Sequence, residues 1–171
     1  MEQEEDIEEN IKELTIKEEE FNICEFLFKR RKENELILLN IGLNENMMNY
    51  LINYFNKSIL FGIGIKEDID EKIKNNNRIK LYLGTSPYNI NLESSNIKFD
   101  IITISNDEID IIKIVFLIDT YSMLLRENGL LIVENINEND IPNIKEMIKQ
   151  ELRDIMESYK ENNKNILIIN K

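Results

Sequence analysis

The feature that most constrains the fold is a series of five short apolar runs, separated by polar stretches and by segments with helical spacing. Three of the runs end directly before a glycine. Runs that are apolar on both faces are typical of parallel strands covered by helices on both sides of a sheet. The series therefore predicts a mostly parallel sheet, with strands at residues 36–41, 59–63, 79–83, 99–104 and 130–133.

Two of the intervening segments have apolar residues at steps of three and four, which predicts amphipathic helices over 47–55 and 111–125. The polar stretch 64–78 has room for only a turn or two of helix. Residues 85–98 contain Pro87 and several Asn and Ser residues, which indicates an irregular connection. Alternation of strands and helices predicts an α/β fold, a three-layer sandwich with a doubly wound, mostly parallel sheet.

In the C-terminal part, the residue pattern predicts a helix over 140–150 and a last strand over 166–169. Residues 152–159 fit either an extension of that helix or a strand that pairs with the last one. We favour the strand, because a hairpin would complete the sheet. The chain of 171 residues is long enough for one domain with a buried core. We expect an acidic N-terminal helical segment over 1–34 and the α/β domain over 35–171.

Composition excludes several classes of function. The net charge of −12 disfavours a basic patch for nucleic acid. The absence of histidine excludes His-based catalytic triads and His-ligated zinc, and the single Cys24 excludes an internal disulfide. No apolar run reaches the roughly 20 residues that span a bilayer, and the N-terminus is acidic. We expect a soluble cytoplasmic protein that binds neither membranes nor nucleic acid.

Five motifs follow one another in the order and spacing of class I S-adenosylmethionine (SAM) methyltransferases. They lie at residues 38–45, 60–65, 78–86, 99–102 and 128–136. Their sequences most resemble the branch that contains the macrocin and mycinamicin sugar O-methyltransferases and the cephalosporin-hydroxylase-like proteins. The resemblance covers about 100 residues and implies the Rossmann-like fold of that family, with SAM as the cofactor.

The resemblance also implies where a cofactor would lie. In such sheets, ligands bind beyond the carboxyl ends of the strands. A glycine turn after the first strand approaches the amino-acid part of SAM, an acid ending the second strand binds the ribose, and a polar residue after the third contacts the adenine. The candidate cofactor-binding residues at or near these positions and at the end of the last core strand are Asn40, Gly42, Asn44, Gly64, Glu67, Thr85 and Glu134.

Several of these positions depart from the family pattern. Asn40 stands where the first motif has Glu, and Gly64 stands where the ribose-binding acid is expected. Losing that carboxylate removes two charge-assisted hydrogen bonds of roughly 1.5–3 kcal/mol each; Glu67 is the nearest substitute. Thr85 replaces an acid, and Ile104 to Glu108 replaces the metal-binding Asp-Asp-Gly-Ser-His. We therefore expect no metal, and the sequence assigns no catalytic residue.

Two functions remain open. One is a non-catalytic methyltransferase-like protein that acts through a protein partner or as a homo-oligomer. The other is a divergent SAM-dependent O-methyltransferase acting on a small-molecule or sugar hydroxyl, with the acceptor near residues 105–108 and Glu134. The first predicts a cofactor region filled by Met47, Met48 or an N-terminal segment. The second predicts an open cleft into which Glu67 points. A third candidate, another nucleotide-binding α/β protein, lacks a P-loop motif.

Overall fold

The computed structural model describes residues 23–89, 96–105, 110–161 and 164–171. The chain forms two compact units, Met1–Arg30 and Arg31–Lys171. The described part of the first unit is essentially one helix, α2 (Ile23–Phe28). The 3-10 turn η1 (Lys29–Arg31) follows it and crosses the boundary between the units. Most of the acidic segment predicted over 1–34 lies outside the described residues.

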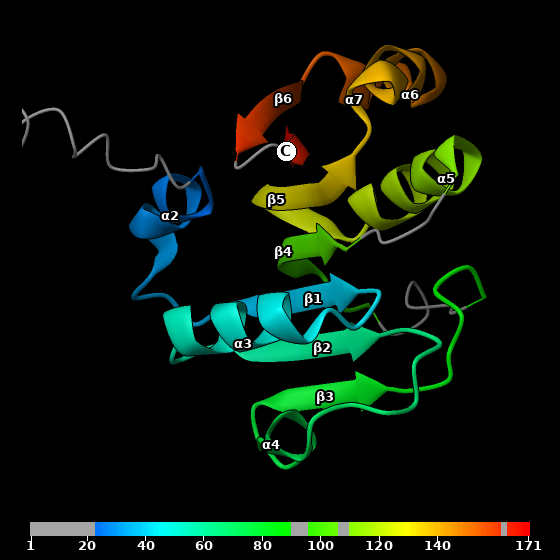
Figure 1. Cartoon of the computed structure of the whole chain (residues 1–171). Helices are drawn as coiled ribbons and strands as arrows, with labels where there is room; N and C mark the ends of the chain where they lie inside the picture. The colour runs from blue at the N-terminus through cyan, green and yellow to red at the C-terminus, as the bar shows by residue number, and fades with distance from the viewer. Residues whose placement is uncertain (1–22, 90–95, 106–109, 162–163) are drawn as a thin grey trace, which may run out of the picture. The chain divides into compact units, whose positions relative to one another are not determined.

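The second unit is built on a seven-stranded sheet with the order β3-β2-β1-β4-β5-β7-β6. Neighbouring strands from β3 to β5 are parallel (Figure 1). β7 is antiparallel to both β5 and β6. This arrangement confirms the predicted α/β class with a mostly parallel sheet. The strands are β1 (Ile37–Ile41), β2 (Ile59–Ile63), β3 (Ile79–Tyr82), β4 (Phe99–Ile104), β5 (Leu125–Ile136), β6 (Met156–Glu161) and β7 (Lys164–Asn170).

Helices cover both faces of the sheet. On one face, α3 (Glu45–Tyr54) brings Met48 against Gly62 of β2. The next residue of the strand, Ile63, belongs to the apolar cluster formed with α5 (Ile111–Ser122). Because successive side chains of a strand point to opposite faces, α3 and α5 lie on opposite sides of the sheet. The remaining helical elements are α4 (Glu71–Lys74), η3 (Glu138–Asp140), α6 (Ile141–Met147) and α7 (Gln150–Arg153).

The C-terminal part differs in detail from the sequence prediction. The helix predicted over 140–150 is divided, because Ile148 at the end of α6 is extended and α7 begins anew at Gln150. β5 starts at Leu125, five residues before the predicted strand, with Asn128 at a positive φ of 62° and a shift of register against β4. The favoured hairpin is confirmed by the pairing of β6 with β7.

The helices in the described part of the chain are short compared with the roughly 20 residues that span a bilayer. Within residues 23–89, 96–105, 110–161 and 164–171, none is both long and apolar enough to cross a membrane.

Candidate cofactor site

The turn after β1 requires a glycine. Gly42 has a φ of +103°, and its N–H donates to the carbonyl oxygen of Ile63 at 2.8 Å. A Cβ atom at Gly42 would lie 2.6 Å from the carbonyl oxygen of Ser105. Both the positive φ and this close approach exclude a side chain. At this turn the backbone after β1 therefore lies close to the ends of β2 and β4.

Asn40, the last but one residue of β1, is fully buried. Its Nδ2 donates to Thr103 Oγ1 at 2.8 Å and to Ser105 Oγ at 3.2 Å, and its Oδ1 accepts from the N–H of Asn44 at 3.0 Å. Both amide protons and one oxygen lone pair are thus used inside the chain. Asn40 braces the turn against β4, in the place where the family pattern has a glutamate.

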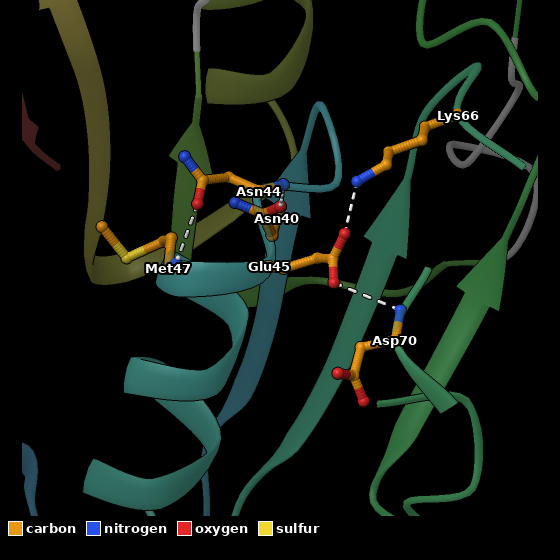
Figure 2. A network of polar contacts seen from close by, with 6 residues as sticks. All are labelled: Asn40, Asn44, Glu45, Met47, Lys66 and Asp70. Atoms are coloured by element: carbon orange, nitrogen blue, oxygen red, sulfur yellow. Dashed lines mark hydrogen bonds and ion pairs between the residues drawn. The ribbon is translucent and has the colours of Figure 1, made fainter. Parts of the chain in front are cut away.

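Asn44 begins α3. Its Oδ1 accepts from the N–H of Met47 at 3.0 Å, so it is the N-cap of the helix (Figure 2). An asparagine N-cap satisfies one of the amide groups that the first turn leaves without an intrahelical partner. Both polar groups of Asn44 seen in this network, its N–H and its Oδ1, therefore hold the turn and the helix in place.

Leu43 lies between Gly42 and Asn44, and the sequence analysis assigned it no role in the site. It has a positive φ of 55° and is buried, with 2% of its surface exposed. A Cβ atom built at Gly64 would lie 2.9 Å from Leu43 Cγ, and one built at Gly62 would lie 3.0 Å from Leu43 Cδ2. The Leu43 side chain therefore occupies the space that a side chain at Gly64, the expected ribose-binding position, would need.

Of the residues predicted to fill the cofactor region, Met48 packs against Gly62, beside Leu43. Met48 Cε would be 2.9 Å from a Cβ at Gly62, and Met47 is buried within α3. The sequence did carry a signal for this packing: glycines at two alternate positions, Gly62 in β2 and Gly64 directly after it, mark a close approach of other atoms. It does not say which residue makes the approach.

Gly64 and Thr85 are brought together by the backbone. The Gly64 carbonyl accepts from the N–H of Thr85 at 3.0 Å, and the Gly64 N–H donates to the carbonyl of Tyr82 at 3.3 Å. The Thr85 hydroxyl donates to the carbonyl of Leu83 at 3.2 Å. The two candidates thus extend the pairing of β2 with β3 beyond the strand ends.

Glu67 is exposed and lies over the turn after β3. Its Oε1 is 3.1 Å from the position of a Cβ atom at Gly84, which has a φ of +61°. The Glu67 carboxylate therefore lies beside Gly84, in the turn after β3. The ribose-binding acid is expected at the end of the second strand instead.

A network that the sequence did not predict joins α3 to the loop after β2. Glu45, in the first turn of α3, pairs with Lys66 and accepts from the N–H of Asp70 at 3.2 Å (Figure 2). The hydrogen bond from Lys66, followed by the one from Asp70, lowers the pKa of Glu45 below its ordinary value. An acid near a helix N-terminus is favourable on its own, and here it also ties α3 to the loop after β2.

Glu134 lies near the end of β5 and is half-buried. Its Oε2 accepts from Ser105 Oγ at 3.2 Å. Ser105 Oγ in turn accepts from Asn40, so a polar chain runs from the turn after β1 to β5. The other residues of the predicted acceptor region, 106–108, lie outside the described residues. Within the described part of the chain, no group of three or more Asp, Glu, His or Cys residues is placed to hold a metal ion.

Comparison with known proteins identifies the fold. No protein-family model and no curated protein sequence matches the chain. Similar solved structures include an rRNA methylase from Streptococcus thermophilus, with a TM-score of 0.66 and 9% identity over 91% of this chain and 98% of that one. The human methyltransferase-like protein 13, in complex with S-adenosylhomocysteine (SAH), has a TM-score of 0.59 and 14% identity over 87% and 76%.

A third similar structure is the MycE methyltransferase from the mycinamycin biosynthetic pathway, in complex with Mg, SAH and mycinamycin VI. Its TM-score is 0.61 with 13% identity over 86% of this chain, which spans only 44% of the MycE chain. At these identities the likeness concerns the fold alone. The fold is the Rossmann-like fold of class I SAM-dependent methyltransferases, which confirms the expectation at that level.

Proposed function

We propose that the chain is a non-catalytic methyltransferase-like protein that acts through a protein partner. The observation that carries the proposal is the packing of Leu43 against Gly64. A carboxylate at position 64 and a leucine at position 43 would compete for the same space. The buried Leu43 side chain is therefore compatible with glycine at position 64 but not with a carboxylate there. Without that carboxylate, the residues present do not fit the ribose of SAM.

The polar contacts around this position support the same proposal. In a cofactor site, polar groups of the loops after the first two strands are directed at the ligand. Here the Asn40 amide binds Thr103, Ser105 and Asn44. Glu45 crosses to the loop after β2. These contacts hold the end of β1, the start of α3 and the loop after β2 together, and none of them involves a ligand.

The second candidate is a divergent SAM-dependent O-methyltransferase acting on a small-molecule or sugar hydroxyl. It is favoured by Glu134, a half-buried carboxylate near the end of β5 in contact with Ser105. The resemblance of the motifs to the macrocin and mycinamicin branch points the same way. This candidate requires that SAM binds without a carboxylate at position 64, and that Leu43 moves away.

Calorimetric titration of the full chain with SAM and with SAH distinguishes the two candidates. We expect no binding at about 1 mM cofactor, which corresponds to a binding free energy weaker than about −4 kcal/mol. A micromolar Kd, about −8 kcal/mol, would overturn the proposal and support the methyltransferase.

Matched variants test the carrying observation. The double variant Leu43→Ala with Gly64→Asp removes the leucine and supplies the acid, and we expect it to gain SAH binding. Leu43→Ala alone opens the space without the acid and serves as the control. Equal affinities of both variants and the unchanged chain would show that the Leu43 packing does not control access to the site.

A further inference from the structure

We propose that the groove between α5 and α6 binds a lysine- or arginine-rich amphipathic helix of a partner protein. The inference rests on the proposed function and names the chemistry of the partner. α5 and α6 pack beside each other (Figure 1). They form the walls of a groove of about 670 Å³, which is lined by Asp110, Ile111, Ile112, Asp140, Asn143, Glu146 and Met147.

The groove carries large apolar side chains on its surface. Ile112 of α5 is 71% exposed and Met147 of α6 is 50% exposed. Both side chains line the groove, together with the partly buried Ile111. Single exposed apolar residues are ordinary, but a contiguous group on two adjoining helices is typical of an interaction surface. A volume of this size is in the range of pockets that bind ligands, so it accommodates several aliphatic side chains.

The charge of the groove selects the partner. Three lining residues are acidic, Asp110, Asp140 and Glu146, and none of the described lining residues is Lys or Arg. Asp110 is partly neutralised, because it caps α5 and pairs with Lys113 at 3.5 Å. Asp140 precedes α6 but makes no side-chain capping bond. An apolar floor with an acidic rim complements a segment that presents aliphatic anchors between basic residues.

The same charges disfavour two other occupants. A second copy bound through the same groove would place each acidic rim against its equivalent, because a two-fold interface contacts itself. The N-terminal residues 2–20 of this chain are rich in glutamate, so the rim repels them as well. We therefore favour a basic helix as the occupant. Such a helix would bind by placing apolar anchors, spaced three and four residues apart, in the groove.

The test uses a fluorescent designed peptide of about 14 residues, with Leu at helical spacing and Lys elsewhere, titrated against the full chain at about 0.15 M salt. A peptide with Glu in place of Lys tests the charge, and one with Ser in place of Leu tests the anchors. We expect only the Lys/Leu peptide to bind. Binding of the Lys/Ser peptide with equal affinity would mean that only the attraction to the net charge of −12 drives binding. That result would overturn the proposal.

Chain variants locate the site. We expect Ile112→Ser and Met147→Ser each to weaken binding of the Lys/Leu peptide about tenfold. Ile65→Ser is the matched control, because Ile65 is 74% exposed and lies in the loop after β2. We expect it to leave the affinity unchanged. Equal effects of Ile65→Ser and Ile112→Ser would overturn the proposal.

Sedimentation without peptide tests whether a second copy of the chain occupies the groove. Self-association that is lost in Ile112→Ser would also overturn the proposal of a basic partner helix. None of these measurements involves SAM or SAH. A failure of the groove and a failure of the non-catalytic assignment are therefore distinguishable.

Discussion

The carboxyl ends of β1 and β2 differ from the outer surface of α5 and α6 in what their side chains contact. At the strand ends, Leu43 and Asn40 are buried and make contacts within the chain. On the helices, Ile112 and Met147 are exposed. In α/β folds the strand ends are the usual ligand site. The proposed non-catalytic function requires this contrast between buried strand ends and an exposed helix surface, and we rank the following predictions by the size of the effect expected at each region.

The largest effect is expected at the turn after β1. Gly42→Ala places a Cβ against a backbone oxygen at a positive φ, and we expect a loss of about 4 kcal/mol in the free energy of unfolding, from strain and overpacking together. Gly84→Ala is the control, because the added Cβ meets only the end of the flexible Glu67 side chain. It should lose about 1 kcal/mol. Urea denaturation measures both, and equal losses would contradict the close approach.

Asn40→Ala should have the next largest effect. It leaves the Thr103 hydroxyl, the Ser105 hydroxyl and the N–H of Asn44 without this partner, and we expect a loss of about 3 kcal/mol. Asn49→Ala, at an exposed position of α3, should change stability by less than about 0.5 kcal/mol. Thermal and urea unfolding compare the two variants. A small effect of Asn40→Ala would mean that water replaces the amide, so that the site is open.

Glu45→Gln tests the connection between α3 and the loop after β2. The pKa of Glu45 is lowered in the folded chain, so its ionised form contributes stability at neutral pH. That contribution is lost as the pH falls through the lowered pKa. We expect the variant to lose about 0.5 kcal/mol at pH 7, as for a surface ion pair, and to approach the stability of the unchanged chain in acid. Glu71→Gln, which breaks a more exposed pair with Lys74, is the control in urea titrations over pH. A difference that grows toward acid pH would refute this role for Glu45.

The smallest effect is expected in the groove. Ile112→Ser should change the free energy of unfolding by less than about 0.5 kcal/mol, because the side chain is exposed and Ile and Ser have similar helix propensities. Ile65→Ser gives the matched measurement outside the groove. A loss above about 1 kcal/mol for Ile112→Ser alone would assign Ile112 to the core of the chain and would remove the contrast between the two regions.

The fold was largely predictable, because buried parallel strands and amphipathic helices leave regular patterns. The helix over 47–55 corresponds to α3, and the polar stretch 64–78 holds only the short α4, as expected. The start of β5 was missed, because the polar residues Arg126–Asn128 interrupt the apolar pattern where the register against β4 shifts. The division of the last helix was missed as well, because nothing in the apolar spacing marks the extended Ile148.

The candidate site was less predictable than the fold. The motifs located Gly42, Asn40 and Asn44 at the turn where the structure has them. Their partners depend on side-chain contacts between strands that are distant in the sequence, such as Asn40 with Thr103. The role of Leu43 depends on a backbone conformation that leucine rarely adopts. A pattern of residue types does not reveal a positive φ at a non-glycine residue.

The position of β7 between β5 and β6 has a consequence during synthesis. Of the described strands, β7 leaves the ribosome last, yet β6 pairs with it and with no other described strand. Until β7 is inserted, β5 presents an unpaired edge in which Leu131 and Val133 already lie. Open edges of apolar strands are templates for pairing with other chains. The interval before β7 is inserted is therefore when a nascent chain is most exposed to aggregation, and chaperone dependence should concentrate there.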